Sequence, residues 1–131
     1  MALTDAQRRP DLEAHDRALR LSIDALVAEL RDQLGVRLVA VLAGVGETRA
    51  VHEWADGGRA PREETANRLR LAYRITAMLT ARDAPEVAQA WWQGLNPQLD
   101  DRSPARLLRD GDLDEVGPQL LAAARAFSAG A

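Results

Sequence analysis

The chain has 131 residues, a formal net charge of −3, 47% hydrophobic residues and no cysteine. This length holds one domain or two small helical units around a shared core, and the composition excludes a disordered chain, a disulfide framework and thiolate chemistry. No apolar run reaches the roughly 20 residues that span a bilayer, and the polar N-terminus is unlike a signal peptide, so we expect a cytoplasmic protein without membrane contact.

Charge is distributed unevenly along the chain. Residues 62–82 carry five arginines against two glutamates, whereas the segment after Arg82 is acidic. A basic middle and an acidic tail predict different partners for the two parts. The slightly acidic total argues against a protein whose whole surface binds nucleic acid.

The first third of the chain predicts one amphipathic helix behind a flexible lead-in, Met1–Pro10. Apolar residues between Asp11 and Leu34 recur at spacings of three, four and seven, which is one stripe of a helix. Asp11 is the expected N-cap and Gly35 the expected C-cap. We favour a packing helix, with a dimerisation helix as the alternative.

Residues 36–61 predict two short helices, Arg37–Ala43 and Thr48–Asp56, joined by a turn at Gly44–Gly46. Two short helices around a glycine-containing turn are what a helix-turn-helix requires, with Val51 and Trp54 pointing into its core. The ending EWADGGRAP resembles the "W..G.R.P" close of Xre-type helix-turn-helix domains.

In this geometry the second helix presents side chains to the DNA major groove. Arg49 would pair with guanine, Thr48 with a base edge or a phosphate, and Arg59 with a phosphate. Neighbouring Glu53 and Asp56 oppose such contacts, so a helix-turn-helix kept only for packing or dimerisation stays open as the alternative. The residues expected to contact DNA are Thr48, Arg49, His52 and Arg59.

A long helix is expected over Arg62–Ala81, with Tyr73 and Met78 as core or dimer contacts. The chain then breaks at Asp83-Ala84-Pro85, and Pro85 is well placed to begin the next helix. This break is the expected boundary between two modules, residues 11–82 and residues 83–131.

The second module opens with a helix, Glu86–Leu95, which ends where Asn96 precedes a proline. Because neighbouring residues of a helix are about 100° apart, we expect Trp91 in the core and Trp92 partly exposed as a contact anchor. Ser103 and Pro104 are the N-cap and first residue of a short helix, Pro104–Arg109.

Two expectations complete this module. Gly111 is expected to end the short helix in the left-handed conformation. A last helix is expected from near Leu113, with Pro118 in its first turn and Asp114–Gly117 as a possible separate turn. Its apolar stripe would be Leu120, Leu121, Ala124 and Phe127.

The run WWQGLNPQLDDRSPARLLRDG resembles the toxin-binding domain of the Xre/MbcA/ParS antitoxins, whose pattern is close to W…NP.L.g.SP..lL..G. The resemblance covers residues 85–126. In one departure from the pattern, Asp101 stands where a glycine is common before Arg-Ser-Pro.

The resemblance implies an antitoxin of a type II toxin–antitoxin system. It would neutralise a RES-domain NAD-degrading toxin, or a related ADP-ribosyltransferase, by covering its cleft, and Phe127–Ala131 would reach into that cleft. The helix-turn-helix would form a homodimer on operator DNA and repress the shared operon. The side chains expected to contact the toxin are Trp92, Asn96, Arg102, Ser103 and Phe127.

The sequence thus predicts an all-α protein, a helix-turn-helix bundle followed by a small helical toxin-binding domain. We expect no catalytic residue, metal or cofactor, because His15 and His52 lack carboxylates at ligand spacing. Two alternatives are a stand-alone helix-turn-helix regulator and an interaction scaffold that does not bind DNA.

Overall fold

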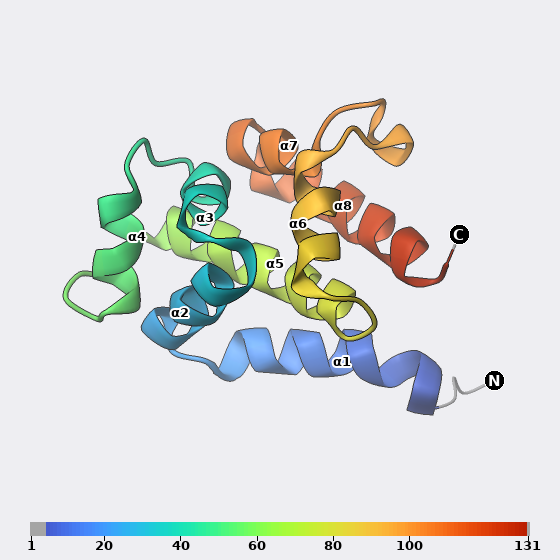
Figure 1. The fold of residues 1–131 in the computed structure, drawn as a ribbon, viewed down its shortest axis with the longest axis horizontal. Helices are drawn as coiled ribbons and strands as arrows, with labels where there is room; N and C mark the ends of the chain where they lie inside the picture. Colours follow the sequence, from blue (N-terminus) through green and yellow to red (C-terminus); the bar gives the residue numbers. More distant parts are fainter. Residues whose placement is uncertain (1–4, 131) are drawn as a thin grey trace.

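The computed structural model describes the backbone of residues 5–130 and the side chains of residues 11–130. This part of the chain forms eight α-helices and one 3-10 helix, and no strand, so the expected all-α class is confirmed (Figure 1). The helices are α1 (Asp5–Arg20), α2 (Ile23–Leu34), α3 (Val36–Ala43), α4 (Thr48–Ala55), α5 (Glu63–Thr80), α6 (Pro85–Gln93), η1 (Pro97–Leu99), α7 (Pro104–Asp110) and α8 (Leu113–Ser128).

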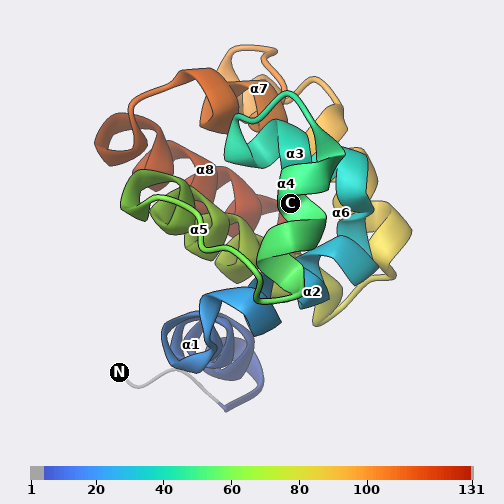
Figure 2. The same cartoon turned by 90° about the vertical axis from the view of Figure 1, so that its left-hand side faces the viewer.

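Helix α5 is the central element of the bundle. Helices α1, α2, α3, α6 and α8 all pack against it. Figure 1 shows α5 running through the middle of the molecule, and Figure 2 shows it between α1 and α8. Its buried residues therefore lie on more than one side of the helix, as expected for an element covered by several neighbours. They are Leu69, Ala72, Tyr73, Ile75, Thr76, Met78 and Leu79.

The expected single helix over residues 11–34 is wrong, because the chain bends at Leu21 and Ser22 and forms two helices. Ser22 takes an extended conformation, which suits an N-cap, at the start of α2. The bend separates two different surfaces, since α2 buries four apolar side chains whereas Leu12 and Leu19 of α1 are 47% and 66% exposed. Among residues 11–20 of α1, only the small residues Ala14 and Ala18 are buried.

Helix α1 also begins earlier than expected. The lead-in predicted over Met1–Pro10 is wrong for Asp5–Pro10, which are helical, and Met1–Thr4 lie outside the described residues. Polar contacts hold the helix against the bundle. Asp11 accepts hydrogen bonds from Arg74 of α5 at 3.4 Å and from Arg125 of α8 at 3.0 Å.

The two expected modules share one hydrophobic core. The turn between α5 and α6 coincides with the expected boundary, but α6 packs on α2, α7 packs on α3, and α8 packs on α5. Buried side chains from both sides of the boundary form a single cluster. The two modules therefore pack together as one unit around a common core.

The last helix is continuous, so the expectation that Pro118 lies in its first turn is wrong. Helix α8 begins at Leu113 after the N-cap Asp112, and Pro118 lies inside it. Proline removes one hydrogen bond to the carbonyl four residues earlier, which is that of Asp114. Both residues are exposed, so water can hydrogen-bond this carbonyl without a break in the helix.

Candidate functional site

The corner between α6 and α7 closes on Asn96. Its side-chain oxygen accepts from the backbone N–H of Gln98 at 2.9 Å, which starts the 3-10 helix. Its backbone N–H donates to the carbonyl of Arg102 at 3.1 Å, and its carbonyl accepts from the N–H groups of Leu99 and Asp101, both at 2.9 Å. Asn96 therefore organises the loop through its own backbone and side chain.

Two aspartates in this corner adopt the left-handed conformation. Asp100 has φ 56° and Asp101 has φ 60°. Glycine is the usual residue in this conformation, and aspartate is one of the few others that tolerate it. Asp101 stands where the resembled pattern commonly has glycine. Its backbone adopts the left-handed conformation that glycine favours.

The ends of α7 are set by Ser103 and Gly111. The Ser103 hydroxyl accepts from the N–H of Arg106 at 3.2 Å, which confirms Ser103 as the N-cap ahead of Pro104. The left-handed conformation expected at Gly111 is wrong, since its φ is −89° and its ψ 165°. Glycine is needed there for space, because a Cβ would lie 2.4 Å from Cγ1 of Val116 and 2.7 Å from the Leu107 carbonyl oxygen.

The expectation of a partly exposed Trp92 is also wrong. Trp92 is completely buried, and its indole N–H donates to the Thr76 hydroxyl of α5 at 3.0 Å. Trp91 packs edge-on against it with ring centroids 5.1 Å apart. Helix α6 contacts α2, α5 and α7, so these helices cover it on more than one side. Trp92 therefore cannot be a surface anchor.

An apolar groove of about 630 Å³ lies between α6, the loop that follows it, and α8. Leu95, 76% exposed, and Phe127, 41% exposed, contribute large apolar side chains to its lining. Trp91 also lines it, and its indole N–H is buried without a hydrogen-bond partner among the described residues. The other lining residues are Glu86, Val87, Ala90, Gly94, Asn96, Pro97, Gln98, Ala123 and Ala126.

The groove brings together only part of the predicted toxin contacts. Asn96 and Phe127 line it, whereas Arg102 and Ser103 belong to the corner outside it and Trp92 lies in the core. Sequence reasoning did not assign Leu95 to the site. The available signal is the spacing of Val87, Ala90, Trp91 and Leu95, which places these four apolar residues on one side of the expected helix.

The segment expected to be a helix-turn-helix consists of α3 and α4 joined by a short turn. Gly44 turns the chain with φ 79°, and Val51 and Trp54 are buried as expected. Thr48 is half-buried, whereas Arg49, His52 and Arg59 are exposed. The predicted DNA contacts are therefore accessible to different degrees.

Most of these groups already have partners within the protein. Glu53 accepts from Arg49 at 2.9 Å and from Arg59 at 3.3 Å, and Nδ1 of His52 lies 3.0 Å from Nη1 of Arg31. Arg49, with 83% of its side chain exposed, would lose little free energy by exchanging Glu53 for another anion. The pairs thus lower the positive charge of the surface without blocking it.

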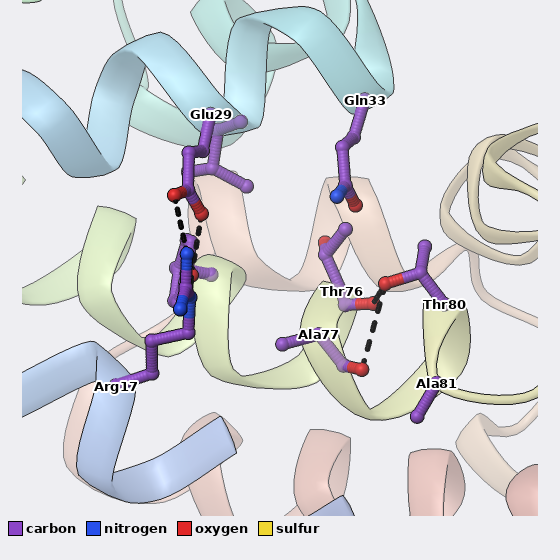
Figure 3. A pocket seen from close by; sticks show the side chains of 9 residues that line it. Arg17, Glu29, Gln33, Thr76, Ala77, Thr80 and Ala81 are labelled. Carbon is purple, nitrogen blue, oxygen red and sulfur yellow. Dashed lines mark hydrogen bonds and ion pairs between the residues drawn. The ribbon is translucent and has the colours of Figure 1, made fainter. Parts of the chain in front are cut away.

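A second hollow, of about 350 Å³, lies between α1, α2 and α5 (Figure 3). Arg17 donates to the Tyr73 hydroxyl at 2.7 Å and to Glu29 at 2.8 Å, and Tyr73 donates to Glu29 at 2.6 Å. Burial, and then the bond to Glu29, raise the pKa of Tyr73 to about 12. Burial acts to raise the pKa of Glu29, but the bonds from Tyr73 and Arg17 outweigh it and lower this pKa. Because the three groups satisfy one another, we assign them the role of joining α1 to α2 and α5.

The described part of the chain contains neither a candidate metal site nor a candidate membrane-spanning helix. Its histidine, aspartate and glutamate side chains form no cluster of three that could hold a metal ion. None of its helices combines the length and apolar character that crossing a membrane requires.

Comparisons with known proteins give no relative: no family model, no curated protein and no solved structure matches the chain.

Proposed function

We propose that the protein is the antitoxin of a type II toxin–antitoxin pair and that its groove binds the toxin. The observation that carries this proposal is the exposure of Leu95 and Phe127 on one apolar hollow. Contiguous apolar surface on a small protein typically marks a site of protein association. Large apolar side chains gathered around a depression also supply the kind of buried anchor that dominates binding energy.

The resemblance of residues 85–126 supports the identity of the partner, a RES-domain NAD-degrading toxin or a related ADP-ribosyltransferase. Neutralisation would be steric. Phe127 stands near the end of α8, so a toxin held against the groove would meet the last residues of this helix. Helix α4 would anchor a homodimer on operator DNA for autorepression.

The test uses the protein encoded by the adjacent reading frame, if that frame is of the RES type. We expect the two purified proteins to form a stable complex and NAD degradation by the toxin to stop in it. Leu95→Glu places a charge in the groove, so we expect at least a tenfold weaker complex by calorimetry.

Leu19→Glu is the matched control, because Leu19 is also a strongly exposed leucine but lies on α1. It should bind as the wild type does. Equal affinities for the two variants, or a toxin that remains active in the presence of this protein, would contradict the proposal.

A stand-alone transcriptional regulator is the second candidate, and one observation favours it. The groove has the size and apolar character of small-molecule sites, and the indole N–H of Trp91, which has no partner within residues 11–130, would orient a ligand. An operon without a toxin gene, together with DNA binding that changes when a small apolar ligand is added, would support this function. Absence of any DNA binding would leave the interaction scaffold.

A further inference from the structure

A basic notch lies where the second module meets the helix-turn-helix. It has a volume of about 400 Å³ and is lined by Arg37 of α3, Gly46 and Thr48 near the turn, and Arg106 and Arg109 of α7. Three arginines thus line one depression, and no aspartate or glutamate does. The remaining lining residues are Ala40, Val41 and Val45.

The fold accounts for one of these arginines and leaves two. Arg109 is half-buried and donates to the Val41 carbonyl at 3.2 Å, which joins α7 to α3. Arg37 is exposed, and no carboxylate of residues 11–130 lies within ion-pair distance of it. Arg106 has only an exposed partner, Asp110 at 3.8 Å, and such pairs contribute little.

The position of the notch indicates its ligand. Thr48, the first residue of α4, belongs to its lining, so an anion held there would lie beside the start of the expected recognition helix. A recognition helix directs its N-terminal residues into the major groove, and helix N-termini are among the groups that contact DNA phosphates. Two nearby carboxylates oppose such binding, those of Glu47, the exposed N-cap of α4, and of Asp110, the partner of Arg106.

We propose that this notch binds a backbone phosphate of double-stranded DNA and that α7 therefore belongs to the DNA-binding surface. Arginine is suited to phosphate because its planar group donates two parallel hydrogen bonds. The inference rests on the DNA-binding half of the proposed function and is independent of the toxin. It assigns to the acidic second module a role beyond capturing a partner.

The site is specific for B-form duplex DNA if α4 is inserted alongside it. The major groove of B-DNA admits an α-helix, whereas that of duplex RNA is too narrow. The lining of the notch and the lining of the apolar groove have no residue in common, so DNA and a toxin would contact different residues of the second module.

The test is fluorescence anisotropy with a labelled random-sequence duplex of about 30 base pairs, titrated at several salt concentrations. The association constant K falls as salt rises, so the slope of log K against log salt is negative. Each lost phosphate contact reduces the magnitude of this slope by about 0.9, which corresponds to roughly fivefold weaker binding at physiological salt. We expect this change for Arg37→Gln and for Arg106→Gln. Both side chains are exposed, and thermal unfolding should show that both variants remain folded.

Arg20→Gln is the matched control, since it removes one positive charge from an exposed position on α1. It should leave the slope unchanged. A wild-type protein that does not bind the duplex, slopes equal to that of the wild type, the same loss in Arg20→Gln, or equally tight binding of an RNA duplex would each overturn the assignment. Toxin capture measured with Arg106→Gln separates the two proposals, because it should be retained even where DNA binding is weakened.

Discussion

At the scale of single residues, the adjacent Trp91 and Trp92 are both buried but differ in hydrogen bonding. The indole N–H of Trp92 donates to the Thr76 hydroxyl, whereas that of Trp91 has no partner among the described residues. We predict that Trp92→Phe lowers the free energy of unfolding by about 2 kcal/mol. The change removes packed volume and leaves the hydroxyl of Thr76 buried without its donor. Urea unfolding followed by circular dichroism measures this loss.

Trp91→Phe is the control for volume, because the same atoms are removed without breaking a hydrogen bond to the described residues. Its loss of stability should be clearly smaller than that of Trp92→Phe. Equal losses would mean that the bond to Thr76 contributes nothing measurable. The comparison also shows why truncating Trp92 would not report on partner binding, since the primary effect would be on folding.

At the scale of elements, the passage from α7 to α8 depends on the absence of a side chain at Gly111. We predict that Gly111→Ala destabilises the protein by about 1–3 kcal/mol, since the new Cβ would overlap Val116 and the Leu107 carbonyl oxygen. The fall in melting temperature, followed by thermal unfolding, measures this destabilisation. The double variant with Val116→Ala should recover only part of the loss, because the carbonyl belongs to the backbone.

Gly46→Ala serves as the matched control in the helix-turn-helix. A Cβ at Gly46 meets nothing within 4 Å, and no positive φ restricts the residue. The variant should be as stable as the wild type or slightly more stable, because alanine reduces the freedom of the unfolded chain. A stable Gly111→Ala protein would show that the loop can move away from α8.

The elements that local chemistry fixes could be predicted from the sequence. Pro85 and the pair Ser103-Pro104 mark the starts of α6 and α7, and these helices begin at Pro85 and Pro104. The bend at Ser22 could not be predicted, because the apolar spacing continues through it and only the packing of α1 across the bundle separates the two helices. Periodicity reports which residues share a face but does not report what covers that face.

The same limit applies to the candidate site. The sequence placed Trp91 and Leu95 on one face of a helix, but their exposure depends on how closely α8 approaches α6, which no local signal encodes. The side chain of Trp92 bonds to α5, which lies on the other side of the expected module boundary. Phe127 is a predicted toxin contact only through the resemblance to the antitoxin family, and it does line the groove.

At the scale of the whole molecule, the two proposed surfaces lie apart. Figure 1 shows α4 at one end of the bundle, while the loop after α6 and the end of α8, which line the groove, lie toward the other. A partner held in the groove would therefore leave α4 accessible. This arrangement suits a protein that holds a toxin and an operator at the same time, as the proposed function requires.

The shared core also predicts how the protein unfolds. Residues on either side of the boundary at Asp83 pack together: Trp92 bonds to Thr76, Gln89 donates to the carbonyl of Gln33 at 2.8 Å, and Arg82 donates to that of Ser128 at 2.7 Å. We predict that the full chain unfolds in one cooperative transition and that a fragment ending at Arg82 does not fold cooperatively. The fragment would expose the side of α5 that α6 and α8 cover, a loss of apolar burial too large for a helical unit of this size. Calorimetry of both proteins measures this, and a fragment with a sharp transition near the temperature of the full chain would show instead that the helix-turn-helix is an independent domain.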